Sequence, residues 1–176
     1  MTMNPAQSRT SRRSLRLGVA LLLTAFACAA HADGHARSAS DATTEEITLV
    51  TIADARSGVG QAIATGGPGD LPGNLFVFDQ PLLNSRYEPI GTNSGYCVRT
   101  LPGKHSQCLW TLTLANGTIT VAGSEADAGT SLIPVIGGTG AYLMAGGMLA
   151  TTPNGDRTYT QVLTLLLHAT ASEREP

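Results

Sequence analysis

The sequence LIPVIGGTGAYLMAGGMLATT, residues 132–152, decides how the rest of the chain can fold. It has apolar residues on both sides of a glycine cluster at 137–140, and a second glycine pair follows at 146–147. Glycine permits the positive φ angles and the close backbone approach that a sharp corner needs. The stretch therefore predicts two strands joined by a glycine-rich bend. A phosphate-binding loop is the alternative, but no amphipathic helix follows to hold an anion.

The rest of the chain from residue 46 onward consists of short β-type runs with almost no helical periodicity. Turn signals separate the runs at regular spacing, which predicts an all-β domain, either a small antiparallel barrel or a sandwich. A glycine- and proline-rich loop at 66–73 is long enough to form a lid or rim. About eight strands are expected, at residues 47–52, 75–79, 91–99, 107–114, 118–123, 131–136, 141–152 and 157–168.

The first 32 residues have the layout of a secretory signal. Arginines precede an apolar run at 17–30 that is too short to span a bilayer comfortably. Small residues at Ala30 and Ala32 predict cleavage after Ala32, hence an exported protein, periplasmic or secreted. The pair Arg12-Arg13 also fits a twin-arginine signal, which leaves the export route open. We expect a flexible leader at 33–45, the barrel domain at 46–170 and a tail at 171–176.

Cleavage would make the chain more acidic. The signal holds four of the eleven Lys and Arg residues and none of the thirteen Asp and Glu, so the formal net charge falls from −2 to −6. Such a surface repels nucleic-acid phosphates and anionic lipids alike. We therefore expect no nucleic-acid partner and no membrane span in the mature protein.

The turn at residues 102–103 sets the register of one hairpin, in which facing residue numbers sum to 205. Cys97 then lies opposite Cys108, and Gly95 lies opposite Trp110. Two cysteines directly across an antiparallel pair in an exported protein form a disulfide. A free thiol pair or half of a metal site is the alternative, but no second ligand pair stands at metal-binding spacing.

Two Asn-Gly pairs predict two further hairpins. The pair at 116–117 gives a register sum of 233, which places Leu114 beside Ile119 and Leu112 beside Val121. The pair at 154–155 gives a sum of 309. Opposite pairs in that hairpin are Tyr142 with Leu167, Met144 with Leu165, Gly146 with Leu163, Met148 with Gln161 and Ala150 with Tyr159.

The last hairpin is rich in apolar side chains on both faces. One face cannot stay fully in water, so we expect one to line the interior and a second subunit to cover the other, in a homo-oligomer such as a dimer or trimer. The face that carries Trp110 is the best candidate for the interior, because the facing glycine makes room for the indole. Asn93 shares this face, and its buried amide serves either a loop backbone or a ligand. Residues expected to line a ligand pocket are Asn93, Trp110, Leu112, Tyr142, Met144, Leu163 and Leu165.

Three motifs together resemble the dirigent proteins and the wider barrel family that includes the allene oxide cyclases. They are VIGGTGAYLMAGG at 135–147, LFVFDQPL at 75–82 and GTITVAG at 117–123, and they occur in family order. The resemblance implies an eight-stranded antiparallel β-barrel of lipocalin-like shape, often trimeric, with an apolar pocket for a small hydrophobic molecule. In that family an acidic residue follows GGTG and an arginine follows later; here these positions hold Ala141 and Gly146. Asp79 is the one matched polar group and so the candidate catalytic residue, although it can equally cap a turn.

Three functions remain open. The first is an exported protein that steers the cyclisation or coupling stereochemistry of a bound hydrophobic molecule by proximity. The second is a non-catalytic binder of such a molecule, and the third is a structural envelope protein whose core has no cavity. No pattern suggests a Ser-His-Asp set, a metal centre or a nucleotide loop. We therefore expect no metal or cofactor, and an enzyme of this kind would be a cofactor-free cyclase or isomerase.

Overall fold

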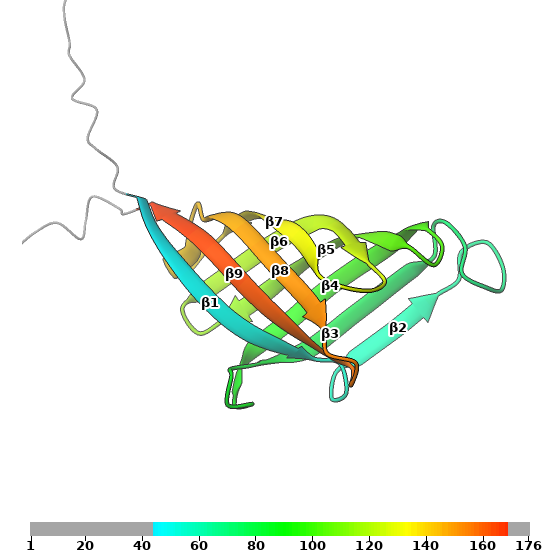
Figure 1. The fold of residues 1–176 in the computed structure, drawn as a ribbon, viewed down its shortest axis with the longest axis horizontal. Coiled ribbons are helices and arrows are strands. Elements are labelled where there is room, and N and C mark those ends of the chain that lie inside the picture. The colour runs from blue at the N-terminus through cyan, green and yellow to red at the C-terminus, as the bar shows by residue number, and fades with distance from the viewer. Residues whose placement is uncertain (1–43, 169–176) are drawn as a thin grey trace, which may run out of the picture. The chain divides into compact units, whose positions relative to one another are not determined.

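The computed structural model describes residues 44–168, which form a closed antiparallel β-barrel of eight strands with one further strand at its edge (Figure 1). This confirms the expected barrel. The predicted signal, leader residues 33–43 and the tail lie outside the described residues. The elements are β1 (Thr44–Asp54), β2 (Val59–Ile63), β3 (Leu75–Leu83), β4 (Pro89–Leu101), β5 (His105–Leu114), β6 (Gly117–Ala126), β7 (Ser131–Gly138), the 3₁₀ turn η1 (Gly140–Tyr142), β8 (Gly146–Pro153) and β9 (Thr158–His168).

The barrel closes because β1 pairs with two neighbours. It runs along the whole of β9, from Thr44 opposite His168 to Asp54 opposite Thr158, and near its end it also pairs with β3. The remaining strands follow in the order β9-β8-β7-β6-β5-β4-β3, and β2 pairs with β3 outside the ring. The sequence did not predict β2. All five of its residues are exposed, so there is no alternation of buried and exposed positions by which to recognise a strand. In the part of the chain described, no helix is long and apolar enough to cross a membrane.

One half of the interior is a packed apolar core. Inward-facing side chains from five strands fill it and leave no exposed surface. We call this half the packed end; its fully buried members are Leu112, Ile119, Val121, Ile133, Leu149, Leu163 and Leu165. At the opposite end β7, β8 and β9 contribute polar inward-facing residues, namely Ser131, Thr151 and Gln161. We call this half the open end.

The hairpin of β4 and β5 has the predicted register. Cys97 pairs with Cys108, Gly95 with Trp110, and Asn93 with Leu112. A side chain at position 95 would collide with the backbone oxygen of Leu109 and the Cβ of Trp110. The glycine is thus required for the indole to lie across the sheet, as the sequence indicated.

The hairpin of β5 and β6 is shifted by two residues from the prediction. Leu112 faces Ile119, and the turn is made by residues 115–116 because Gly117 already pairs with Leu114. Gly117 is held in the strand because its Cα packs against the backbone oxygen of Thr139, where no Cβ would fit. A shift of two keeps each side chain on its face, so the assignment of the interior was still correct.

The hairpin of β8 and β9 is shifted by three residues, which was a more serious error. Leu149 faces Leu163 and Thr151 faces Gln161, because the turn spans residues 154–157 instead of the Asn-Gly pair alone. Side chains stabilise this longer turn: Asp156 accepts hydrogen bonds from the backbone N–H and the hydroxyl of Thr158. An odd shift moves one strand to the other face. The interior of β8 therefore carries Leu149 and Thr151, and Met148 lies outside.

The glycine-rich bend joins β7 to β8 as predicted, but the second strand begins five residues later than expected. Residues 139–145 form η1 and a turn, in which Ala145 N–H donates to the Tyr142 carbonyl. Gly140 (φ 61°) packs so closely on the Asn116 carbonyl oxygen that a side chain would not fit. The glycine cluster thus seats the bend on the turn between β5 and β6.

Candidate ligand-binding site

A cavity of about 290 Å³ lies at the open end of the barrel. The interior residues at this end do not fill the space, because β8 and β9 contribute Thr151 and Gln161 where the packed end has Leu149 and Leu163. The hydroxyl of Thr51 donates a hydrogen bond to Oε1 of Gln161 at 3.1 Å, which fixes that amide against the wall. Most of the cavity wall is therefore built from the strands, and the β6–β7 loop adds Asp127 and Gly129.

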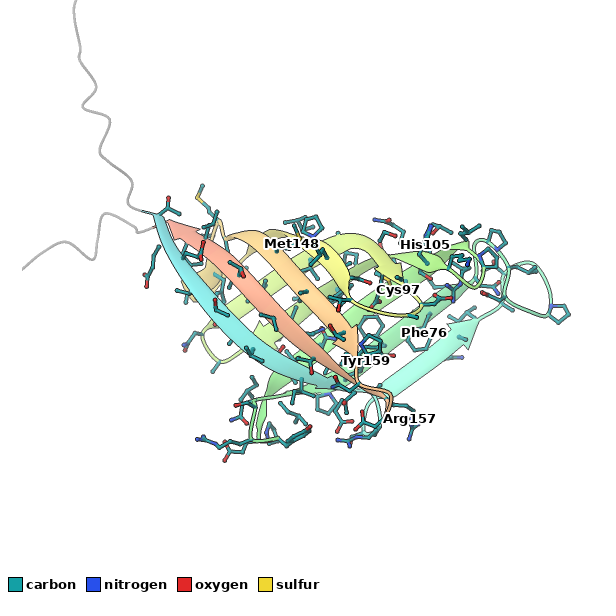
Figure 2. The ribbon with its side chains drawn as sticks, viewed as in Figure 1. Phe76, Cys97, His105, Met148, Arg157 and Tyr159 are labelled. Carbon is teal, nitrogen blue, oxygen red and sulfur yellow. A yellow bond between two sulfur atoms is a disulfide. The ribbon has the colours of Figure 1, made fainter. Side chains whose placement is uncertain are left out.

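Four aromatic residues line the cavity: Phe76 and Phe78 from β3, Trp110 from β5 and Tyr159 from β9. The Phe78 and Trp110 rings meet edge to face with centroids 6.4 Å apart, and Phe76 stacks on Phe78 at 6.0 Å. Figure 2 shows Phe76 and Tyr159 at the end of the barrel near β2. Aromatic walls of this kind favour a flat apolar ligand.

Three buried polar atoms that line the cavity have no hydrogen-bond partner among residues 44–168. They are Gln80 Oε1, Asn93 Oδ1 and Trp110 Nε1. Each such atom costs about 1–3 kcal/mol of stability, and buried polar groups in proteins are rarely left without a partner. Two acceptors and one donor on residues of the cavity wall are thus without a partner.

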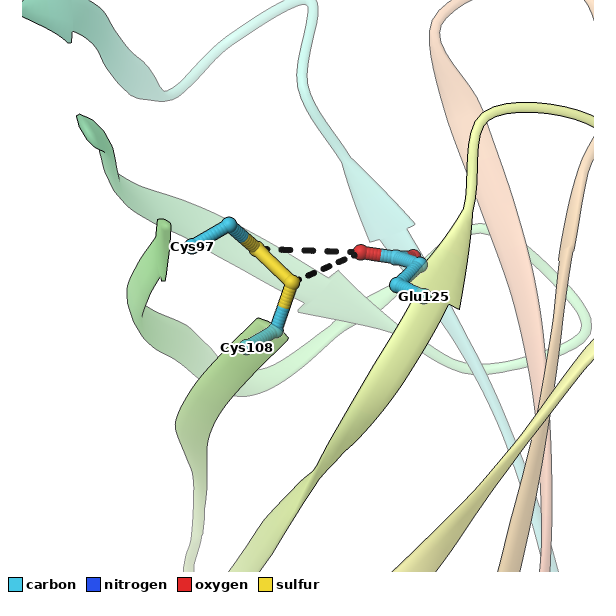
Figure 3. A group of neighbouring side chains, drawn as sticks. All are labelled: Cys97, Cys108 and Glu125. Atoms are coloured by element: carbon cyan, nitrogen blue, oxygen red, sulfur yellow. Dashed lines mark hydrogen bonds between the residues drawn. A yellow bond between two sulfur atoms is a disulfide. The ribbon is translucent and has the colours of Figure 1, made fainter. Parts of the chain in front are cut away.

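A disulfide and a carboxylic acid form one wall of the cavity. Cys97 and Cys108 are joined with an S–S distance of 2.03 Å, as predicted. Oε2 of Glu125, at the end of β6, lies 3.5 Å from Sγ of Cys108 and 3.8 Å from Sγ of Cys97 (Figure 3). Burial raises the pKa of Glu125, and the nearby Asp127 carboxylate raises it further. Because the two sulfurs are bonded to each other, they are not available as thiolate ligands for a metal beside this carboxylate.

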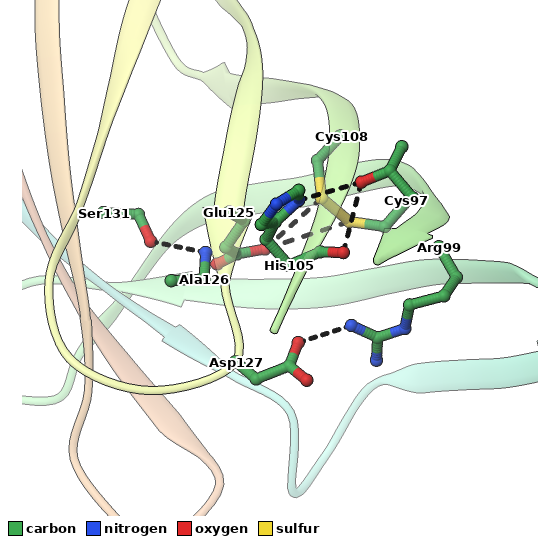
Figure 4. The surroundings of a disulfide bond; sticks show 9 residues. Cys97, Arg99, His105, Cys108, Glu125, Ala126, Asp127 and Ser131 are labelled. Atoms are coloured by element: carbon green, nitrogen blue, oxygen red, sulfur yellow. Dashed lines mark hydrogen bonds and ion pairs between the residues drawn. A yellow bond between two sulfur atoms is a disulfide. The ribbon is translucent and has the colours of Figure 1, made fainter. Parts of the chain in front are cut away.

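Arg99 is the one cation among the cavity-lining residues, and two acids already bind it. Its guanidinium pairs with Asp127 in the β6–β7 loop (Figure 4) and with Asp70 in the loop at 64–74, at 2.8 Å. Asp70 also accepts a hydrogen bond from the Gly103 N–H at 2.8 Å. The mouth of the cavity therefore carries more negative than positive charge and offers no free cation.

The structure brings two of the residues predicted for the site together and places three others elsewhere. Asn93 and Trp110 line the cavity. Leu112, Leu163 and Leu165 belong to the packed end, where they are fully buried. They face the interior as expected, but they pack beyond the inner end of the cavity and do not line it.

The residues taken from the bend and from the family motif do not line the cavity. Tyr142 packs on the core from η1, and Met144 (φ 59°) is 71% exposed, because residues 141–145 do not continue the strand. Asp79, the candidate catalytic residue, is exposed on the outer face of β3, where it pairs with Val59 of β2. The expectation for Tyr142 and Met144 assumed a regular strand at 141–152, whereas Asp79 was taken from the family motif as a residue at a strand end and lies within β3.

The sequence did contain signals for the residues that were missed. Gln80 follows Asp79, so placing Asp79 outside would have placed Gln80 inside by alternation. Glu125 continues the interior face of β6 beyond the predicted strand end at residue 123. Tyr159 alternates with Gln161, Leu163 and Leu165 along β9, so it too could have been placed on the interior face.

The chain matches the family model described as dirigent-like protein over residues 38–171. Its barrel is similar to the solved structures of a pyocyanin demethylase (TM-score 0.60, 21% identity, 68% of this chain and 99% of that one) and a pterocarpan synthase dirigent protein (0.59, 15%, 73% and 90%). It is also similar to an exo-specific intermolecular Diels-Alderase (0.56, 14%, 70% and 99%). At these identities the similarity shows a common fold. No curated protein sequence matches the chain.

Proposed function

The chain belongs to the dirigent-like family, and we propose that its barrel binds a small hydrophobic molecule in the open-end cavity and steers the cyclisation or coupling of that molecule without a cofactor. The observation that carries this proposal is the set of unpartnered polar atoms on Gln80, Asn93 and Trp110 inside an aromatic cavity. A filled structural core would instead pack apolar atoms against the indole. The three neighbours are each named for a reaction, which supports catalysis over storage.

The size and charge of the cavity restrict the class of ligand that it can bind. An apolar protein cavity of about 150 Å³ accepts benzene, so about 290 Å³ accommodates two fused rings with part of the molecule extending through the mouth. Arg99 is already bound by Asp70 and Asp127 and cannot neutralise an anion. A neutral ring system is therefore favoured over a fatty acid epoxide, whose carboxylate would find no partner here.

The test uses Trp110, the only tryptophan of the chain. Its fluorescence is recorded while neutral aromatic molecules, phenylpropanoids and fatty acid epoxides are added to the purified protein. We expect a saturable change with neutral aromatics, and then turnover by the ligand that binds best. Thr151→Phe, which fills the cavity from β8, is the matched control and should abolish the change while the circular dichroism spectrum is retained. The absence of a saturable change with every compound would contradict the proposal; binding without turnover would favour a carrier.

An outer apolar surface supports a homo-oligomer as part of this proposal. Leu132, Ala150, Val162 and Val50 are paired one after another across β7, β8, β9 and β1. Leu132 is 64% exposed and Val50 42%. A charge at Val162 should dissociate the oligomer in sedimentation experiments, whereas Thr113→Glu, on the outer face of β5, should not. A wild-type monomer would refute this part of the proposal.

The disulfide fits an extracellular protein, because such bonds persist in oxidising compartments. We propose export with removal of residues 1–32. N-terminal sequencing of the exported protein should begin at Asp33, and retention of the full chain in the cytoplasm would contradict this.

A further inference from the structure

The carboxyl of Glu125 is an unusual group for a cavity wall. It lies against a disulfide, and its only side-chain contacts of hydrogen-bond type among residues 44–168 are with the two cysteine sulfurs (Figure 3). Ser106, which pairs with it from β5 and also lines the cavity, makes no hydrogen bond to it. Disulfide sulfurs carry no proton and cannot donate to a carboxylate. The ionised form of this half-buried carboxyl would therefore have neither a donor nor a cation bonded to it, which is unfavourable.

The charged groups around Glu125 also favour its neutral form. Asp127, two residues further on, repels a second negative charge, and Arg99 on β4 is occupied by Asp127 and Asp70. Tyr159 on β9 faces the cavity as a neutral phenol, and both its burial and Glu125 raise its pKa. His105 on β5 pairs with Ala126, the residue after Glu125, so alternation directs it to the opposite face, where it contacts Thr100.

We propose that Glu125 is the proton donor of the cavity and that the Cys97–Cys108 disulfide keeps it neutral by offering its carboxyl no hydrogen-bond donor. The proposal rests on the cavity being the ligand site. Glu125 then donates a hydrogen bond to a carbonyl oxygen of a bound neutral aromatic molecule. Asn93, Gln80 and Trp110 hold the same molecule through their unpartnered atoms.

Proton transfer from this position is sufficient for a cyclisation. The O–H bond of Glu125 breaks as its proton passes to the carbonyl oxygen of an enone. A hydroxyl of the same molecule adds to the conjugated carbon, and its proton returns to the Glu125 carboxylate. The enol product tautomerises to an isomer of the substrate, so no oxidant or reductant is needed. Reduction of the disulfide by an added dithiol would create two S–H donors beside the carboxyl and favour its ionised form.

The first experiment follows the Glu125 carboxyl directly, by carbon-13 NMR of glutamate-labelled protein, with Glu125→Gln to assign the signal. We expect titration above the ordinary glutamate range of about 4.3. The Cys97→Ala, Cys108→Ala double variant, which has no donors, should keep the raised value. The Cys97→Ser, Cys108→Ser variant, whose hydroxyls can donate, should lower it. Titration in the ordinary range, or the same value in both double variants, would overturn the proposal whether or not a ligand binds.

The second experiment measures the binding of chromone, a neutral two-ring carbonyl compound, by calorimetry at several pH values. Wild-type affinity should fall by about tenfold as Glu125 ionises, the change expected when one buried hydrogen bond is lost. Glu125→Gln retains an N–H donor, so its affinity should not vary with pH. An equal pH dependence of affinity in both proteins would overturn the proposed role of Glu125 but would leave the proposed function of the cavity intact. No chromone binding at any pH would instead contradict the proposed function.

Discussion

Replacing Asn93 by leucine should stabilise the protein and impair its function. The Asn93 side chain is 3% exposed, and its Oδ1 has no partner among the residues described. Leucine has a similar shape and removes an acceptor whose burial costs about 1–3 kcal/mol. The β4 backbone remains paired with Leu112 and Gln80, so the barrel is unaffected. We expect the free energy of unfolding to rise by about 1–2 kcal/mol and the melting temperature by roughly 4 °C per kcal/mol.

Urea unfolding, with the same slope for both proteins, measures the stability change, and chromone calorimetry measures the loss of binding. Asn84→Leu is the matched control. Its Oδ1 accepts hydrogen bonds from the N–H groups of Arg86 and Glu88 in the β3–β4 turn. The same substitution should there destabilise the protein by about 1 kcal/mol and leave binding unchanged.

The opposite result at Asn93 would refute the reasoning. A variant that unfolds more easily and still binds chromone would mean that the amide serves the structure. The unpartnered oxygen would then be explained by a buried water, which commonly joins such groups. A stabilised variant that has lost chromone binding would show that the amide is retained for the ligand at the expense of stability.

Four further results are expected. Leu163→Ala should cost about 2–5 kcal/mol in urea unfolding because it leaves a void in the packed end, whereas Val59→Ala on the exposed strand β2 should cost less than about 0.5 kcal/mol. Gly95→Ala should cost about 1–3 kcal/mol, since its methyl group would collide with Trp110, and an unchanged unfolding midpoint would contradict this. Hydrogen bonds from Arg56 lower the pKa of Asp54 from 3.8 to about 2, so this stabilisation is complete above pH 3.8 and is lost as the pH falls toward 2. The melting temperature of Asp54→Asn should accordingly vary less than that of the wild type across this range. Asp70→Asn should remove the ion pair between the loop at 64–74 and Arg99 and speed the amide hydrogen exchange of that loop. Unchanged exchange would show that the Asn74 side chain and the hydrogen bond from Gly73 N–H to the Arg99 carbonyl hold the loop.

The predicted register was correct at one of the three hairpins. The register of β4 and β5 followed from the turn at residues 102–103, and it gave the disulfide and the face of Trp110. The register predicted for β8 and β9 was wrong, because the longer turn between them depends on hydrogen bonds between Asp156 and Thr158 that an Asn-Gly pair does not reveal. A shift of three residues then exchanged the two faces of a strand.

The site was harder to predict than the barrel, because it occupies only half of the interior. Sequence alternation identifies which side chains face inward but cannot show where along the strands they leave a space. Leu112 and Asn93 are neighbours across β4 and β5, yet one belongs to the packed end and the other lines the cavity. That boundary is set by all eight strands together, through the volumes of their inward residues.

The interior is divided into a packed end and an open end. This division also explains why the absence of the acid and the arginine that the family resemblance implies does not exclude catalysis in the cavity. Ala141, where the family resemblance implies an acid, lies in the bend before β8, and Gly146, where it implies an arginine, is the first residue of β8. The cavity begins five residues further along that strand, at Thr151. At about 3.3 Å per residue this separation is roughly 17 Å, too far for either position to contact a ligand in the cavity. The acids that do line the cavity are Glu125, at the end of β6, and Asp127, which is already paired with Arg99. The proton transfer proposed for Glu125 therefore belongs to the end of the barrel that holds the disulfide and requires neither position 141 nor position 146.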